Sequence, residues 1–190
     1  MAIKFDNYGE TPLDDISGLI PKNIKTKKEL DDIESINIGK AYLKYILDAQ
    51  KLKKITVDEK YLRQVHKDML CDVWRWAGEY RTTQTTIGVK ATQIRSRIYQ
   101  LCDDLKFWEK EWEYKECATR FHHQLVLIHP FPNGNGRWAR LMTEIWLLKM
   151  GKELPSWGKN SDGARVQYIK ALQLADKSDY KTLERFIFES

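Results

Sequence analysis

Residues 129–140 read His129-Pro130-Phe131-Pro132-Asn133-Gly134-Asn135-Gly136-Arg137-Trp138-Ala139-Arg140. Within a dozen positions the stretch holds an imidazole, amide oxygens, glycines and two arginines. Apolar runs flank it, at 125–128 before it and at 141–142 and 145–148 after it. This pattern predicts a polar loop held between two buried helices, where a rigid catalytic loop would lie.

The residue types in this loop are those that phosphate chemistry uses. His129 titrates near neutral pH and can accept a hydroxyl proton. Gly134 and Gly136 allow successive N–H groups to converge on an anion at the start of the next helix, whose dipole adds positive potential. Arg137 and Arg140 are three apart, so they share a helical face and can grip phosphate oxygens.

Asn133 offers a carbonyl oxygen to Mg²⁺, a hard cation that prefers oxygen ligands. The plainer interpretation of the stretch is a capped loop, with Asn-Gly as turn residues and arginines as surface charges. Each residue fits that interpretation alone, but the combination at this spacing favours the phosphate site.

Composition bounds the class of protein. The chain has 190 residues, a length that suits one domain, and a net charge of +5. No apolar run is long enough to span a membrane. No signal peptide is visible, and three cysteines without metal-ligand spacing favour reduced thiols, so we expect a cytoplasmic protein. The basic balance is too small, and too evenly spread, to indicate nucleic-acid binding.

The apolar spacing predicts an all-α fold with one β-hairpin. Thr26 and Glu29 form a candidate capping box for the first helix. The Thr-rich stretch 80–91 indicates the hairpin. The expected elements are an N-terminal arm over 1–25 and helices over about 26–49, 56–78, 92–108, 114–128, 136–150, 160–174 and 179–188.

The loop His129–Arg140 resembles the signature of the Fic family, His-Pro-Phe-x-(Asp/Glu)-Gly-Asn-Gly-Arg-x-x-Arg. It matches at every fixed position except Asn133. The segment Trp76–Arg81 resembles the family's approach to its hairpin, and residues 121–123 are also similar. The resemblance covers residues 26–188, and the segment 19–21 resembles a subgroup called mobile mystery protein B.

The resemblance implies a Fic-type helical bundle that transfers AMP from ATP to a hydroxyl side chain of a target protein. His129 would deprotonate the target Ser, Thr or Tyr, whose oxygen would attack the α-phosphate. The flap over 80–91 would pair with the target as an added strand. The implied domains are the arm 1–25 and a Fic domain over 26–190, with the catalytic loop at 129–140.

The resemblance also implies roles for the other loop residues. Gly134, Asn135 and Gly136 would form the anion hole, and Asn135 would help to orient the phosphates. Arg137 would hold the α- and β-phosphates and Arg140 the γ-phosphate, with Mg²⁺ as cofactor. Phe131 would plug into the core and fix the loop.

One departure from the family pattern concerns the metal. Asn133 stands where the family has Asp or Glu, so a full negative charge is lost and metal affinity should fall. The related Doc kinases have Lys where this chain has Arg137, and Ala where it has Gly134. Keeping both residues favours nucleotidyl transfer over phosphoryl transfer.

Many Fic proteins are restrained by a helix carrying Ser/Thr-x-x-x-Glu-Gly/Asn, whose glutamate pairs with the second arginine of the signature. Glu34, in the helix 27–49, stands where that glutamate would be, although Leu30 and Ser35 break the pattern. Two interpretations stay open: a regulatory glutamate paired with Arg140, or an ordinary solvated charge. The protein would be controlled by such self-inhibition or by an antitoxin partner.

Three alternatives to AMP transfer remain at the level of sequence. A Fic relative could transfer another nucleotide, such as UMP. Because of Asn133, the chain could bind nucleotide or a partner without turnover. A nucleic-acid binder is disfavoured because no helix carries clustered arginines.

Overall fold

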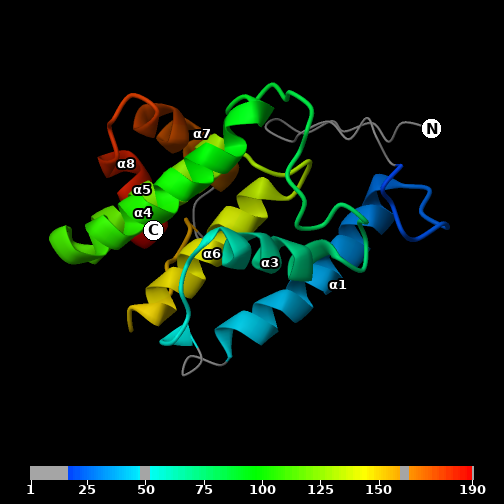
Figure 1. Ribbon diagram of the computed structural model, residues 1–190, viewed down its shortest axis with the longest axis horizontal. Helices are drawn as coiled ribbons and strands as arrows, with labels where there is room; N and C mark the ends of the chain where they lie inside the picture. The colour runs from blue at the N-terminus through cyan, green and yellow to red at the C-terminus, as the bar shows by residue number, and fades with distance from the viewer. Residues whose placement is uncertain (1–16, 48–51, 159–162, 190) are drawn as a thin grey trace.

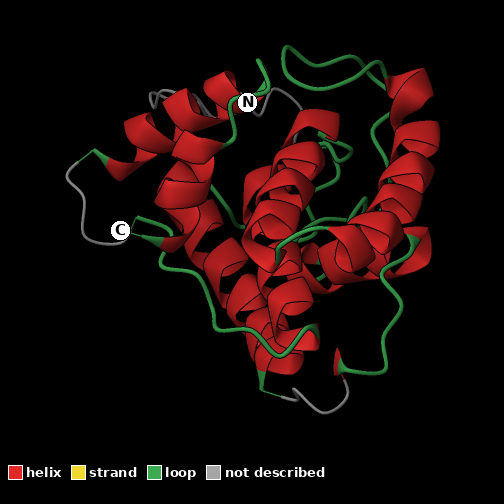
Figure 2. Cartoon of the chain, turned by 90° about the vertical axis from the view of Figure 1, so that its left-hand side faces the viewer, coloured by secondary structure: helices red, strands yellow, loops and turns green. Residues whose placement is uncertain are grey.

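The computed structural model describes residues 17–47, 52–158 and 163–189. Seven α-helices and one 3-10 turn are assigned in these ranges, and none of the described residues forms a ladder of strands (Figures 1 and 2). The elements are α1 Lys27–Ile46, α3 Glu59–Leu70, η1 Ala91–Gln93, α4 Ile94–Glu111, α5 Tyr114–Ile128, α6 Asn135–Lys149, α7 Ala164–Ala175 and α8 Lys181–Phe188. The all-α prediction is confirmed.

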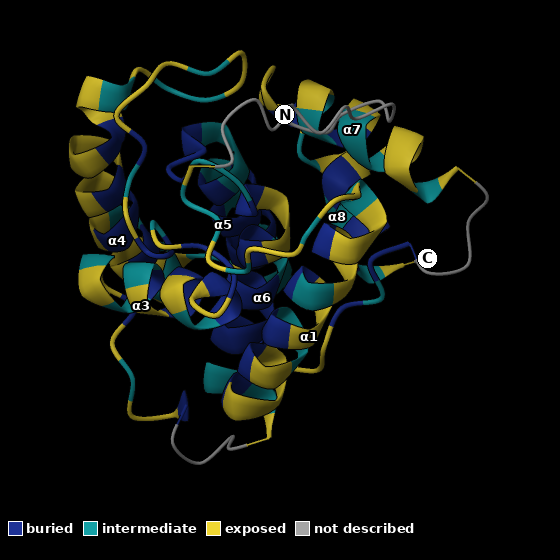
Figure 3. Cartoon of the chain, turned by 90° about the vertical axis from the view of Figure 1, so that its right-hand side faces the viewer, coloured by how far each residue is buried: buried dark blue, intermediate teal, exposed yellow. Residues whose placement is uncertain are grey.

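Helix α6 is the centre of the bundle. It packs against α1, α3 and α5, while α4 covers α5 and α8 joins α7 to α5 (Figure 1). Ten of its residues are buried, and Figure 3 shows it almost entirely in the colour of buried residues. Trp138 and Trp146 are fully buried there. Because α6 begins at Asn135, burial on several sides fixes the polar loop that precedes it.

Helix α1 begins as the sequence predicts but buries a different face. The Thr26 side chain accepts from the Glu29 N–H at 3.2 Å, and the Glu29 carboxylate accepts from the Thr26 N–H at 3.0 Å, completing the capping box. The apolar positions Ile36 and Leu43 are exposed. The buried positions are Leu30, Glu34, Asn37, Ala41 and Tyr45.

Polar residues lie on this buried face because each has a partner. Asn37 donates to the Asp68 carbonyl at 3.2 Å and accepts from the Asp72 N–H at 2.9 Å, which ties α1 to the end of α3. The hydrogen bonds offset the cost of burying the amide. The interpretation of Glu34 as a solvated charge is therefore wrong, since that side chain lies on the buried face as well.

The predicted hairpin over 80–91 is not formed. Residues 80–90 make a loop with no strand assigned, and Ala91 already belongs to η1. The N-terminal arm is described only from residue 17, and the predicted start of a helix at 160–161 lies outside the described residues. No helix in the described ranges is long and apolar enough to cross a membrane.

The capping box gives a first prediction. Thr26→Ala should lower the free energy of unfolding by about 1 kcal/mol, because the Glu29 N–H loses its acceptor. Thr92→Ala is the matched control, since α4 begins without a side-chain cap and Thr92 is exposed. Urea denaturation followed by circular dichroism measures both. An equal loss of unfolding free energy in the two variants would contradict the role of Thr26 as the cap of α1.

Candidate functional site

His129 holds an unusual backbone conformation directly after α5. It caps the helix with φ 50° and ψ 59°, the left-handed region that costs a non-glycine residue about 1–3 kcal/mol. The buried Arg81 side chain stabilises it by donating Nε to the His129 carbonyl at 2.7 Å. The Arg81 N–H also donates to the Pro130 carbonyl at 2.9 Å. The turn that presents the imidazole is thus fixed from outside the loop.

Arg81 also replaces the missing hairpin ladder. Its guanidinium donates to the Thr83 carbonyl at 2.9 Å and to the Val89 carbonyl, so one side chain joins the two arms of the flap. Gly88, with φ +103°, passes so close that an added Cβ would lie 2.6 Å from the His129 Cβ. The flap therefore lies directly over the histidine.

Asn135 closes the polar loop. Its side-chain oxygen accepts from the Phe131 N–H at 2.9 Å, and its amide donates to the Phe131 carbonyl at 2.8 Å. Phe131 is fully buried, and its ring meets that of Trp138 edge-on at 4.9 Å. The Asn135 side chain is thus committed to the loop, which leaves its backbone N–H, at the start of α6, as its group for an anion.

His66 supports the same loop from α3. Its ring stacks on Phe131 with centroids 3.6 Å apart. Nδ1 lies 3.0 Å from the Gly78 N–H nitrogen, so it accepts, and Nε2 donates to the Asn133 carbonyl at 3.0 Å. Burial lowers the pKa of His66 to about 3. His66 is therefore neutral and structural.

The two predicted glycines differ. Gly134 has φ +79°, a conformation that favours glycine, and an added Cβ would lie 2.9 Å from Leu70 Cδ1, so the end of that side chain would have to shift. A Cβ at Gly136 would meet no protein atom within 4 Å. The protein's own packing leaves open space at Gly136, in the first turn of α6, where a helix N-terminus attracts anions.

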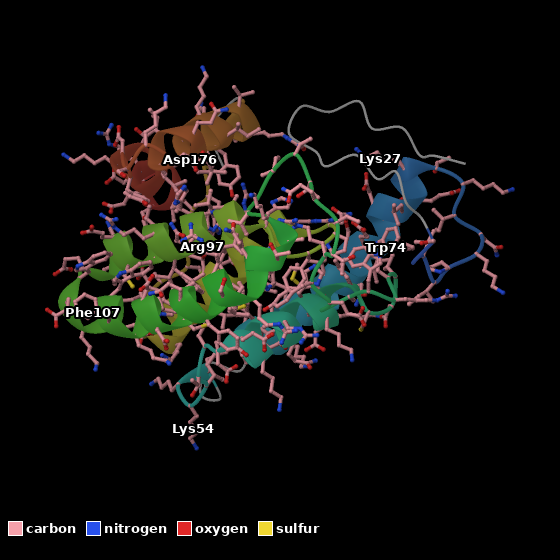
Figure 4. The ribbon with its side chains drawn as sticks, turned by 45° about the horizontal axis from the view of Figure 1, so that its top comes forward. Lys27, Lys54, Trp74, Arg97, Phe107 and Asp176 are labelled. Carbon is pink, nitrogen blue, oxygen red and sulfur yellow. The ribbon has the colours of Figure 1, made fainter. Side chains whose placement is uncertain are left out.

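These residues face a cavity of about 650 Å³, large enough for a nucleotide. Its walls come from the loop, the first turns of α1 and α6, residues of α5, and one face of α7. Lys27 of α1 and Asp176, just after α7, both line it, and Figure 4 shows them on the same side of the molecule. Arg137 and Arg165 also line the wall.

The His129 imidazole lies in the cavity wall and is 8% exposed. Burial and the neighbouring Arg81 guanidinium lower its pKa to about 4, while the Val126 carbonyl opposes this shift. Nδ1 is buried without a well-formed hydrogen bond, which leaves Nε2 as the nitrogen able to meet a ligand. The ring is neutral at pH 7 and presents an acceptor.

Glu34 pairs with Arg137 and not with Arg140. Its Oε2 lies 2.6 Å from Arg137 Nη1, and its Oε1 accepts from Trp74 Nε1 at 2.7 Å. The glutamate is 2% exposed and lines the cavity beside the loop. A carboxylate therefore holds the arginine nearest to the N-terminus of α6.

Arg140 turns away from the cavity. Its guanidinium lies 4.9 Å from the ring centroid of Tyr168 and 5.3 Å from that of Trp157, and it is not among the lining residues. Three positions along a helix rotate a side chain by about 60° and raise it by about 4.5 Å. This displacement brings Arg140 to the aromatic rings, so the two arginines do not meet in one site here.

Asn133 fits a metal ion only weakly. It is half-buried in the cavity wall, and its Oδ1 accepts from the Gly134 N–H at 2.7 Å. Within the described residues, no group of three or more acidic, His or Cys side chains could hold a metal. Mg²⁺ usually combines one or two carboxylates with substrate phosphates. The site suits an ion carried mainly by phosphates, with one amide oxygen as protein ligand.

Sequence reasoning missed the roles of four residues around the site. Nothing in the sequence marks His66 or Trp74 as part of the site, because the residues they contact, Asn133 and Glu34, are distant from them in the sequence. His123 also lines the cavity, where it is buried with its Nε2 2.9 Å from Asp176 Oδ1. Arg81 falls within the segment that carries the resemblance, but its role in holding His129 needs the three-dimensional contacts.

Comparisons with known proteins agree with this geometry. A model of the Fic/DOC family matches residues 56–147. "Protein adenylyltransferase Fic" of Nematostella vectensis is 30% identical over 169 residues, covering 85% of this chain and 38% of that protein. The protein of that name from Drosophila grimshawi is 28% identical over 166 residues, covering 84% and 34%. The chain spans about a third of these relatives' length.

Solved structures share the fold. The N-terminal Fic domain of a Bep effector from Bartonella quintana superposes with a TM-score of 0.69 at 16% identity, covering 90% of this chain and 89% of that one. BepC of Bartonella tribocorum, with bound AMPPNP, gives 0.62 at 19% identity, covering 86% of each. These structures show the same fold, and the family model over residues 56–147 identifies a Fic/DOC family domain in the chain, as the signature loop predicts.

The buried histidines predict a pH-dependent stability. Burial lowers the pKa of His66 and His122 to about 3 and that of His129 to about 4, from 6.5. Between those values the unfolded chain binds more protons, so the free energy of unfolding rises with pH and is lost as pH falls from 6.5 towards 4. Each histidine contributes a slope of up to about 1.4 kcal/mol per pH unit.

Denaturation of wild type and His129→Gln at several pH values between 4.5 and 6 tests this dependence. The variant lacks one of the three groups, so its stability should fall less steeply as the pH is lowered. Parallel curves for the two proteins would contradict the low pKa of His129.

Proposed function

We propose that this protein is a protein adenylyltransferase, which transfers AMP from ATP to a hydroxyl side chain of a target protein. The observation that carries the proposal is the position of His129: a neutral imidazole in a cavity wall, held beside a helix N-terminus that begins Gly134-Asn135-Gly136-Arg137. The relatives named as adenylyltransferases and the Bartonella protein with bound AMPPNP support it.

In this proposal the triphosphate lies at the first turn of α6. The backbone N–H groups of Asn135 and Gly136 face the anion, where the helix dipole adds positive potential, and the Gly134 N–H joins them once it leaves Asn133 Oδ1, its acceptor in the free protein. Arg137 binds phosphate oxygens once it leaves Glu34, and Mg²⁺, bound by the phosphates and Asn133, would neutralise charge on the leaving group. Arg140 would reach the γ-phosphate only by leaving its aromatic contacts.

The transfer is a displacement at the α-phosphorus. His129 takes the proton of the target Ser, Thr or Tyr hydroxyl, the hydroxyl oxygen bonds to phosphorus, and the bond to pyrophosphate breaks. The nucleotide's own negative charge raises the histidine pKa from its low value in the free protein, which makes the ring a better base when substrate is present. Residues 80–91, placed over His129 by Arg81, would dock the target backbone.

Regulation belongs to the same proposal. In the structure Arg137 is held by Glu34, so nucleotide phosphates must displace a carboxylate to reach it. The geometry favours self-inhibition by Glu34 over control by an antitoxin, because the inhibiting group is already supplied within the chain.

Glu34→Gly should raise labelling of the protein or its targets by ATP about ten-fold or more, since an ion-paired hydrogen bond of 1.5–3 kcal/mol is removed from the competing state. Asp32→Gly is the matched control: it places glycine in the same helix but breaks only a surface pair with Lys28. Radiolabelled ATP with Mg²⁺ measures both. Equal labelling of wild type and Glu34→Gly would end the inhibitory role.

His129→Ala, made in the Glu34→Gly protein, should reduce labelling by at least about 100-fold, because the proton acceptor is gone. ATP affinity, measured by calorimetry, should be unchanged, since the imidazole does not hold the phosphates. Binding of ATP without labelling in the Glu34→Gly protein itself would favour a non-catalytic nucleotide-binding protein, and UTP in place of ATP tests the nucleotide.

A further inference from the structure

The segment 17–21, which we call the clamp segment, is paired to the chain just after α3. Leu19 and Trp74 form an isolated antiparallel bridge. The Ile20 N–H donates to the Val73 carbonyl at 2.9 Å. A short stretch from the beginning of the described chain is thus fixed on the residue that holds Glu34.

The clamp segment packs closely against the Trp76 indole at Gly18. The Gly18 carbonyl accepts from the Arg75 N–H at 2.9 Å. A Cβ on Gly18 would lie 2.4 Å from Trp76 Cδ1, and an indole has no flexible end that could move aside. The Trp76 ring stacks on that of Trp74 with centroids 4.9 Å apart. Any side chain at position 18 must therefore shift the clamp segment or the two indoles.

Trp74 joins the clamp segment to the site. Its indole N–H donates to Glu34 Oε1 at 2.7 Å while Glu34 Oε2 holds Arg137. Both Trp74 and Glu34 are almost fully buried, where a hydrogen bond to a charged oxygen is strong. Figure 4 shows Trp74 beside α1, the helix that carries Glu34.

We infer that Trp74 is a positioning residue that keeps Glu34 on Arg137, and that the clamp segment sets the strength of this block. The inference rests on the proposed function. With the segment seated, Glu34 Oε1 has a donor only while the carboxylate stays against Arg137. With the segment displaced, the indole N–H is no longer fixed, so Glu34 loses one of the two groups that hold it and phosphate oxygens can take Arg137 from it at a lower cost. Release of the clamp segment therefore favours nucleotide binding.

The experiment is calorimetric titration with ATP and Mg²⁺ of full-length proteins that carry His129→Ala to prevent turnover. Trp74→Phe keeps a ring but removes the N–H, and should tighten ATP binding roughly ten-fold. Gly18→Ala should tighten it roughly three-fold or more, by displacing the clamp segment. Gly39→Ala is the matched control, because a Cβ there meets nothing within 4 Å, and it should leave the Kd unchanged.

Repeating the titrations in the Glu34→Gly protein separates positioning from a general structural effect. Without Glu34, Trp74→Phe and Gly18→Ala should have no further effect on the Kd, since residues that act through one group are not additive. If Trp74→Phe does not fold, as judged by its thermal melt, the test rests on the Kd of Gly18→Ala measured with and without Glu34→Gly.

Two results would overturn the inference. One is the same change in Kd with and without Glu34; the other is a wild-type Kd in both Trp74→Phe and Gly18→Ala while Glu34→Gly binds more tightly. The second result leaves the proposed function intact. If the Glu34→Gly protein fails to bind ATP at all, the proposed function itself fails, and the inference fails with it.

Discussion

The buried guanidinium of Arg81 is the contact on which the geometry of the site depends. It binds the carbonyl of His129, whose left-handed backbone is costly, and the carbonyls of Thr83 and Val89 in the flap. One cation thus fixes the histidine turn and the loop that covers it. Burial and the same charge lower the His129 pKa, so the contact that positions the imidazole also favours its neutral form.

Below the site, neutral polar contacts hold the loop. Asn135 bonds both backbone groups of Phe131, and His66 stacks on the Phe131 ring while binding the Asn133 carbonyl. Neutral groups suit this position because a buried charge there would need a partner. The charged pair lies in the cavity wall, where Glu34 and Arg137 neutralise each other in the free protein.

Local signals in the sequence predicted local structure well. The capping box at Thr26 and the left-handed Gly134 at the start of α6 follow from residues within four positions, so neighbouring residues suffice to identify them. The signature loop likewise identified the family, because its residues are contiguous. The seven helices assigned in the described residues follow from apolar spacing, although α3 ends at Leu70 and not near residue 78, and the buried face of α1 differs from the predicted one.

Failures of sequence reasoning share one physical origin, a distant partner that changes what a residue can do. Glu34 is buried because Trp74, forty positions away, supplies a donor. The stretch 80–91 has the composition of a hairpin, yet its two arms are joined by the Arg81 side chain, which donates to the carbonyls of Thr83 and Val89. In each case the side chain that decides the structure is not recognisable until the fold brings it near.

Arg140 shows the same effect at the site itself. Its position in the signature predicts a phosphate ligand, but Trp157 and Tyr168 present ring faces to its guanidinium. Moving a guanidinium from two aromatic faces to a phosphate exchanges one favourable contact for another, so the balance depends on how much negative charge enters the cavity. Arg137 would likewise exchange its ion pair with Glu34 for one with a phosphate. Both arginines of the loop are therefore occupied in the free protein, and under the proposed function a triphosphate has to compete for each of them.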